Sequence, residues 1–212
     1  MKNVLTNEYK MSYFMPPIAP IKNEQGQTIA PATLIPFCDV SANQIYQMIT
    51  RSEKLRILTE QVRSAADIRT GKASLLPYVT PCGIFTRRNS KCFVSPSGLA
   101  IVDIDHMDSY QEAAELRYAL FNDPFLRPVL TFISPSGRGV KAFVPYCAAS
   151  QDDEVKRVTE NMIWAMQYVE LTYGAKNDLS TNTPTKGVDI SGKDIVRACF
   201  LSHDPEALFR TL

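Results

Sequence analysis

The sequence contains few of the residues that build soft-metal sites: two histidines and five cysteines in 212 residues. The cysteines are odd in number, scattered along the chain, and form no C-x-x-C pair. This spacing argues against a disulfide framework and a structural zinc site, and it is typical of proteins in a reducing cytoplasm. Because His106 and His203 are the only histidines, a histidine-rich metal centre is excluded as well.

Long apolar runs and an excess of one charge are also missing. No segment approaches the roughly 20 apolar residues that a membrane helix needs, and residues 1–14 contain no apolar signal-peptide region. We therefore expect a cytoplasmic protein with no membrane partner. The 23 basic and 22 acidic residues leave a net charge of +1, so any contact with nucleic acid must come from a local patch.

The first 98 residues predict an α/β appendage. Short apolar runs on either side of a polar turn at residues 23–27 predict two edge strands. Ser41 then precedes apolar residues at helical spacing, and the helical pattern continues to about Gly71. Residues 75–94 predict short strands around a basic turn at Arg87 and Arg88. This turn is a candidate site for nucleic-acid phosphates, with a solvated hairpin as the alternative.

Residues 99–212 show a more regular pattern, which predicts the core of the same domain. The expected elements are a strand at 99–105, a helix at 109–121, strands at 128–134 and 140–145, a helix at 152–174, and a strand at 197–203. The order β-α-β-β-α-β is that of the ferredoxin-like fold. Right-handed crossovers place the first and third strands side by side, with the last strand beside the first. The predicted class is α+β, with its core at about residues 99–203.

Two aspartates end the strand predicted at 99–105. Because side chains alternate along a strand, Asp103 and Asp105 point to one face and repel each other unless a cation lies between them. Oxygen ligands of this kind suit Mg²⁺ or Mn²⁺. An exposed strand end with two solvated carboxylates is the alternative. A third carboxylate can come from residues 187–194, where Asp189 and Asp194 compete for the role.

The segment SPSGRGVK at residues 134–141 is suited to bind an anion. Gly137 and Gly139 allow backbone amides to turn toward a phosphate, and Ser136 adds a hydroxyl group. Arg138 and Lys141 add positive charge. The segment is not a Walker loop, because a strand follows it rather than a helix, and a plain glycine-rich hairpin is the alternative.

Alternation along the strand at 140–145 separates Lys141 from its apolar neighbours Val140 and Ala142. We therefore expect Lys141 on the open face of the sheet, beside Asp103 and Asp105, where its removal leaves the fold intact. Carboxylates and a basic glycine turn on adjacent strands are what metal-dependent nucleotidyl transfer requires.

Four segments together resemble a known family. They are KASLLPYVTPCGIFTRR, IVDIDH, SPSGRGVKAFV and VDISGKDIVRACFLSHDP. In this order they resemble the VirE-type N-terminal domain family of the archaeo-eukaryotic primase (primase-polymerase) superfamily, over about residues 40–209. The resemblance implies an RRM-like catalytic sheet, with Asp103 and Asp105 as the first metal motif and Asp189 in the third. Lys141 stands where that superfamily normally has a nucleotide-binding histidine, so nucleotide binding is the firmer expectation and polymerisation the weaker one.

The expected function is therefore metal-dependent nucleotidyl transfer of the primase-polymerase type, in the DNA replication of a mobile or phage-like element. Mg²⁺ or Mn²⁺ is the expected cofactor, and nucleoside triphosphates and a single-stranded DNA template are the expected partners. Superfamily members are commonly fused to helicase domains, which makes a helicase domain or subunit a further expected partner. Two alternatives use the same residues: a non-catalytic module that binds nucleic acid or nucleotide, and a metal-dependent nuclease.

Overall fold

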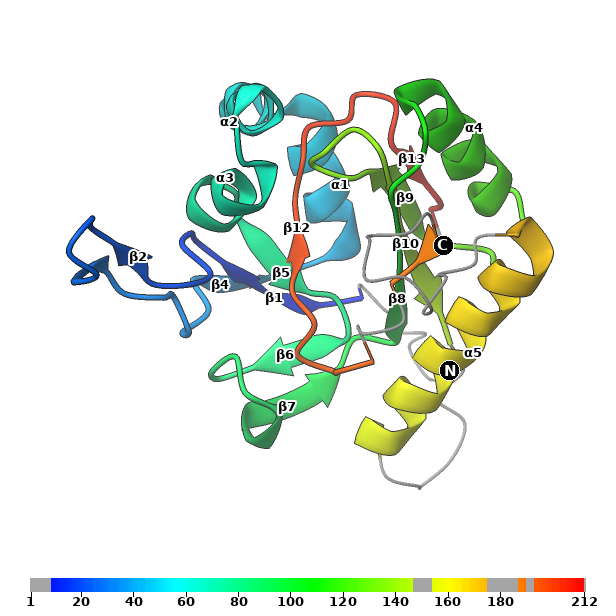
Figure 1. The fold of residues 1–212 in the computed structure, drawn as a ribbon. Coiled ribbons are helices and arrows are strands. Elements are labelled where there is room, and N and C mark those ends of the chain that lie inside the picture. The colour runs from blue at the N-terminus through cyan, green and yellow to red at the C-terminus, as the bar shows by residue number, and fades with distance from the viewer. Residues whose placement is uncertain (1–8, 147–153, 175–186, 190–192, 212) are drawn as a thin grey trace, which may run out of the picture.

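The computed structural model describes residues 9–146, 154–174, 187–189 and 193–211. They form an α+β fold with two main antiparallel sheets that lie next to each other (Figure 1). Among these residues, none of the helices combines the length and the apolar composition that crossing a bilayer requires.

The first sheet has the strand order β12-β5-β1-β4. Its strands are β1 (Met11–Phe14), β4 (Cys38–Val40), β5 (Tyr78–Thr80) and β12 (Cys199–Phe200). Three helices follow β4 along the chain, and they are α1 (Ala42–Arg51), α2 (Glu53–Ser64) and α3 (Ile68–Leu75). Two small hairpins complete this half, β2 (Ile21–Lys22) with β3 (Thr28–Ala30), and β6 (Gly83–Phe85) with β7 (Phe93–Pro96), the latter containing a 3₁₀ turn at Ser90–Cys92.

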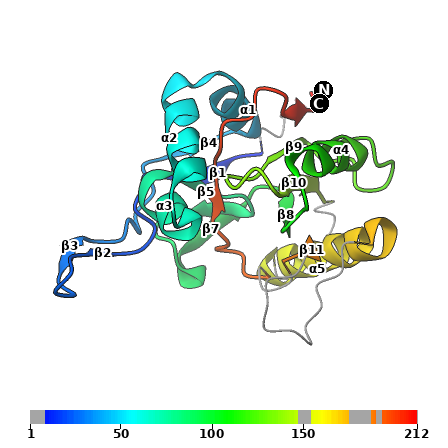
Figure 2. The same ribbon diagram turned by 45° about the horizontal axis from the view of Figure 1, so that its top comes forward.

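The second sheet has the strand order β11-β8-β10-β9-β13. Its strands are β8 (Leu99–Asp105), β9 (Leu130–Ile133), β10 (Val140–Pro145), β11 (Gly187–Val188) and β13 (Leu208–Phe209). The helices α4 (Tyr110–Phe121) and α5 (Glu154–Tyr173) pack on one face of this sheet. Figure 2 shows both helices on the side of the sheet that is turned away from α2 and α3.

The α+β class and the central strand order are as the sequence predicts. The strands β8 and β10 are neighbours in the middle of their sheet, with Asp103 directly opposite Lys141. The expected last strand at 197–203 was wrong, because β11 takes the place beside β8 and β12 pairs with β5 in the other sheet. Since β11 has only two residues, no alternating pattern marks it in the sequence.

The single helical stretch expected from Ser41 to about Gly71 is three helices. Ser41 caps α1 through a capping box with Gln44, as its position predicts. Ser52 then accepts a hydrogen bond from the Leu55 amide and starts α2, while Asp67 caps α3 in the same way. The helical spacing of the apolar residues continues past Ser52 and Asp67. The sequence pattern therefore does not reveal where one helix ends and the next begins.

The C-terminal segment joins the two halves of the molecule. The carboxylate of Asp204 is fully buried and accepts hydrogen bonds from Arg117 on α4 at 2.8 and 2.9 Å and from the Ile133 amide at 2.8 Å. The Asp204 amide in turn donates to Ile49 O of α1 at 3.1 Å. A buried charge is tolerated only with such a full set of partners, and this set fixes α1 relative to the second sheet.

Candidate metal centre

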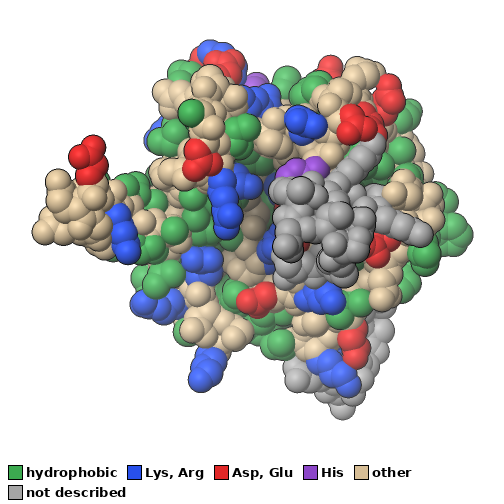
Figure 3. Space-filling model, in the orientation of Figure 1, with side chains coloured by type: hydrophobic (Ala, Val, Ile, Leu, Met, Phe, Trp, Pro, Cys, Tyr) green, Lys and Arg blue, Asp and Glu red, His purple; other side chains and the backbone are tan. Residues whose placement is uncertain are grey.

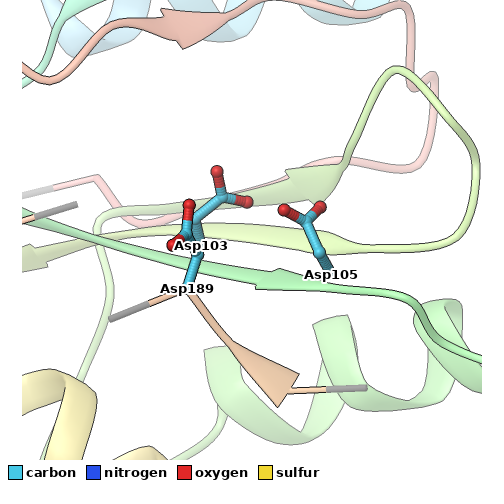
Figure 4. Close-up of side chains that lie close together, drawn as sticks. All are labelled: Asp103, Asp105 and Asp189. Atoms are coloured by element: carbon cyan, nitrogen blue, oxygen red, sulfur yellow. The ribbon is translucent and has the colours of Figure 1, made fainter. Parts of the chain in front are cut away.

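Three carboxylates converge at the C-terminal end of β8. Asp103 and Asp105 lie on the same face of that strand, as its alternation predicts. Asp189 follows β11 directly, and its amide donates a hydrogen bond to Asp103 O at 2.8 Å. One carboxylate oxygen from each residue lies within 4.8 Å of the others. Figure 4 shows the three carboxyl groups extending to the same side of the sheet.

The most buried member of the cluster has an unused oxygen. Asp103 is 6 % exposed, and its Oδ1 atom is buried without a hydrogen-bond partner among the described residues. An unpaired carboxylate oxygen in the interior is unfavourable. Binding a hard divalent cation, for which this oxygen is a suitable ligand, would remove that cost. The three converging carboxylates, with this unpaired oxygen on Asp103, fit Mg²⁺ or Mn²⁺.

Two cations already face these carboxylates. Lys141 Nζ lies 2.5 Å from Asp103 Oδ2, and Arg197 Nη2 lies 3.4 Å from the same oxygen. Arg197 also forms an ion pair with Asp189. Two positive charges thus offset part of the charge of three carboxylates. Sequence reasoning missed Arg197, although its place in the segment that follows Asp189 was a usable signal.

Asp194, the competitor of Asp189 in the sequence, is not in the cluster. Its Oδ1 accepts from the Val196 amide at 3.0 Å, and its carbonyl oxygen accepts from the Arg197 amide at 2.8 Å. Asp194 therefore shapes the turn that presents Arg197 to the carboxylates.

Lys141 is beside the aspartates, as expected, but it is not on an open face. The residue is only 5 % exposed, so the expectation of an accessible side chain was wrong. Burial opposes its charge, but the carboxylates outweigh that effect, Asp103 most of all, and the pKa of Lys141 is raised. Cys199 of β12 belongs to the same buried group, and burial raises the pKa of its thiol to about 12. The chain segment that contains β12 covers this face, which strand alternation alone does not reveal.

The carboxyl group of Asp105 has a raised pKa, because of burial first and the charge of Asp103 second. Ionising such a group works against folding, so its unfavourable contribution appears as the pH rises above the ordinary carboxyl pKa. We expect Asp105→Asn to raise the melting temperature of the metal-free protein at pH 7. The gain should disappear below about pH 4, where the carboxyl group is neutral in both states. Thermal unfolding across this pH range, with chelator present, checks the prediction, and a lower melting temperature at pH 7 would contradict it.

The turn SPSGRG lies against the carboxylate cluster. Gly137 has φ +74°, and a Cβ on Gly139 would lie 2.4 Å from Ile104 O and 3.0 Å from Asp105 Oδ1. Gly139 thus allows the backbone of the turn to approach the metal-binding candidates. Arg138 Nε donates to Met107 O at 2.7 Å, and the Arg138 amide donates to Ser136 Oγ at 3.2 Å.

A cavity of about 460 Å³ opens between this turn and the helix α3. The described residues that line it are Ile68, Arg69, Lys72, Asp105, His106, Ser136 and Arg138. Sequence reasoning assigned Ser136 and Arg138 to the site, and it missed Arg69 and Lys72, which reach it only through the packing of α3. Figure 3 shows Lys and Arg side chains on this face of the molecule, beside α2 and α3.

The two arginines of the basic turn at residues 87–88 differ: one is exposed, and the other contacts neighbouring residues of the protein. Arg87 is exposed. Arg88 Nη2 donates to Ile18 O at 3.2 Å, and its guanidinium lies 5.6 Å from the centre of the Tyr78 ring. Arg88 therefore has an internal structural role, and a contact with nucleic acid stays a prediction for this turn.

The fold and the site define an α+β protein with a candidate divalent-metal centre on a ferredoxin-like sheet. Residues 70–209 match the family described as BT4734-like, N-terminal domain, and the chain belongs to that family. The family is related to VirE N-terminal and primase-like domains. No curated protein and no solved structure gives a match to this chain.

Proposed function

We propose that the protein is a metal-dependent nucleotidyltransferase of the primase-polymerase type. The observation that supports this most directly is the meeting of Asp103, Asp105 and Asp189 beside a cavity with a basic lining. Carboxylates next to a basic cavity suit a substrate that has both a metal-bridging phosphate and further negative charge. The nucleotide is a nucleoside triphosphate, and the template is single-stranded DNA.

Each part of the site has a distinct task in this proposal. The three aspartates hold Mg²⁺ or Mn²⁺, which neutralises and orients phosphate oxygens when bound. Ser136, Gly137, Arg138 and Gly139 form the turn that faces the phosphates. Lys141 is paired with Asp103, so it positions that carboxylate rather than contacting the nucleotide.

The family's relation to primase-like domains supports a proposal for the biological setting. We place the activity in the DNA replication of a mobile or phage-like element, with a helicase domain or subunit as a partner. Arg87, exposed on its turn, is the candidate contact for the template backbone.

A second candidate function is a non-catalytic nucleotide-binding or nucleic-acid-binding module. The observation in its favour is that Lys141 and Arg197 already pair with the carboxylates and offset part of their charge without a metal ion. A lysine also cannot act as the neutral imidazole that the related enzymes are expected to use at this position.

Primer synthesis on single-stranded DNA, with labelled nucleotides and Mn²⁺ or Mg²⁺, tests the proposal. We expect metal-dependent products from the parent protein and none from Asp103→Asn/Asp105→Asn. Triphosphate binding without products would favour the binding module. Degradation of the DNA without added nucleotides would instead indicate a nuclease that uses the same carboxylates.

A further inference from the structure

The cavity beside Asp105 is formed by two parts of the chain that are distant in sequence. The turn after β9 supplies Ser136 and Arg138, and the helix α3 supplies Arg69 and Lys72. Arg69 and Lys72 are three residues apart, so they lie on the same face of the helix. The cavity is thus lined by cations from two separate parts of the chain and by the carboxylate of Asp105.

Both α3 side chains are placed to reach a ligand in this cavity. Arg69 is exposed and Lys72 is half-buried. Lys72 Nζ lies 5.9 Å from the centre of the Phe200 ring, which holds the ammonium group over β12. Its charge also reaches Asp105, since it opposes the rise in the pKa of that carboxyl group.

The helix α3 packs against α2, and α2 contacts the turn. Arg63 of the preceding helix α2 donates from Nε to Pro135 O at 3.1 Å, so it contacts the turn directly. Asp67 caps α3 by accepting hydrogen bonds from the Arg69 and Thr70 amides. A rigid wall keeps the cost of ordering long basic side chains around a ligand low.

The charges of the residues that line the cavity indicate which class of ligand it binds. Arg69, Lys72 and Arg138 supply three positive charges, and Asp105 is the acidic residue among the described lining. Lys141 is not available to the cavity, because it is buried against Asp103. A ligand with several negative charges that also reaches the metal candidates at Asp105 has the chemistry of a nucleotide polyphosphate, and the cavity volume is in the range of small-molecule sites.

We propose that Arg69 and Lys72 bind the phosphate chain of the nucleotide together with Arg138, so that α3 supplies part of the phosphate site. This inference rests on the proposed function. It assigns to α3 the phosphate contacts that Lys141 cannot make. It also makes the N-terminal half of the chain necessary for nucleotide binding.

Isothermal titration of nucleoside mono-, di- and triphosphate with Mg²⁺ tests this assignment in Arg69→Ala/Lys72→Ala. We expect triphosphate binding to weaken by roughly 10- to 100-fold, as for the loss of charged hydrogen bonds, and monophosphate binding to weaken much less. Arg69→Gln/Lys72→Gln removes the two charges but keeps polar side chains, and it should weaken triphosphate binding more than monophosphate binding in the same way. The matched control is Arg51→Ala/Lys54→Ala, which removes the same charge at the same spacing from exposed positions outside this cavity.

The outcomes separate this inference from the proposed function. Parent-like triphosphate affinity in the α3 variants, with the parent binding normally, would overturn the role of α3 and leave the proposed function standing. An equal loss of triphosphate affinity in the control variant would show that the effect comes from net charge alone, and it would also overturn the role of α3. A parent protein that binds no triphosphate would overturn the proposed function itself.

Discussion

Lys141→Met is expected to lower the free energy of unfolding of the metal-free protein by about 3 kcal/mol. The substitution removes the ammonium group that lies 2.5 Å from Asp103 Oδ2, and among the described residues it leaves Arg197 as the cation beside this buried carboxylate. Removing one partner of a buried ion pair typically costs about 3–5 kcal/mol, and the remaining guanidinium places this case at the lower end. Urea unfolding in the presence of a chelator measures the change.

The same variant gives a second readout. If a divalent cation binds at Asp103, Mn²⁺ should restore more stability to Lys141→Met than to the parent, because it supplies the missing positive charge. Lys141→Arg, which keeps the charge, is the control and should show little extra stabilisation by Mn²⁺. A variant as stable as the parent would show that the pair between Lys141 and Asp103 contributes nothing.

The central strands were predictable because their patterns are local. β8 is a nearly continuous apolar run and β10 alternates, and both have the bounds that the sequence indicates. Alternation and the β-α-β-β-α-β order together predict that Lys141 lies beside Asp103 and Asp105, and the structure adds the register that sets Lys141 opposite Asp103. This part of the site depends only on strand periodicity and connection rules.

The remainder depends on contacts between distant segments. The apolar run at 197–203 looks like a strand of the second sheet, but Cys199 and Phe200 pair with β5. Cys199 belongs to the buried surroundings of Lys141, and no pattern around Lys141 reveals this burial. Asp189 reaches Asp103 through β11, a strand too short for periodicity to show.

The cations of α3 and Arg197 illustrate the same limit. Arg69 and Lys72 look like ordinary surface residues of a charged helix, and they become part of the site only because α3 packs beside the turn after β9. Arg197 has the clearer signal, a basic residue in the same motif as Asp189. Its pairing with Asp103 and Asp189 still depends on the turn that Asp194 forms.

Asp103→Asn/Asp105→Asn is expected to lower the affinity for Mn²⁺ by at least about 100-fold, since outer-shell partners alone account for about 10- to 100-fold in metal sites. The reason is direct: the double variant removes two of the three converging carboxylates, including the one whose buried Oδ1 is unpaired among the described residues. Asp105→Asn alone should weaken the binding of Mn²⁺ while stabilising the metal-free fold, which separates loss of a ligand from loss of structure. Glu24→Gln, on the exposed turn between β2 and β3, removes one carboxylate charge away from the cluster and is matched in charge to Asp105→Asn.

Calorimetric titration of Mn²⁺ into the parent, the double variant and the Glu24→Gln control, each confirmed as folded by its thermal transition, is the most direct measurement. The carboxylate site predicts one saturable binding event in the parent and the control, and its loss in Asp103→Asn/Asp105→Asn. Equal affinity in the parent and the double variant would contradict a metal centre on β8.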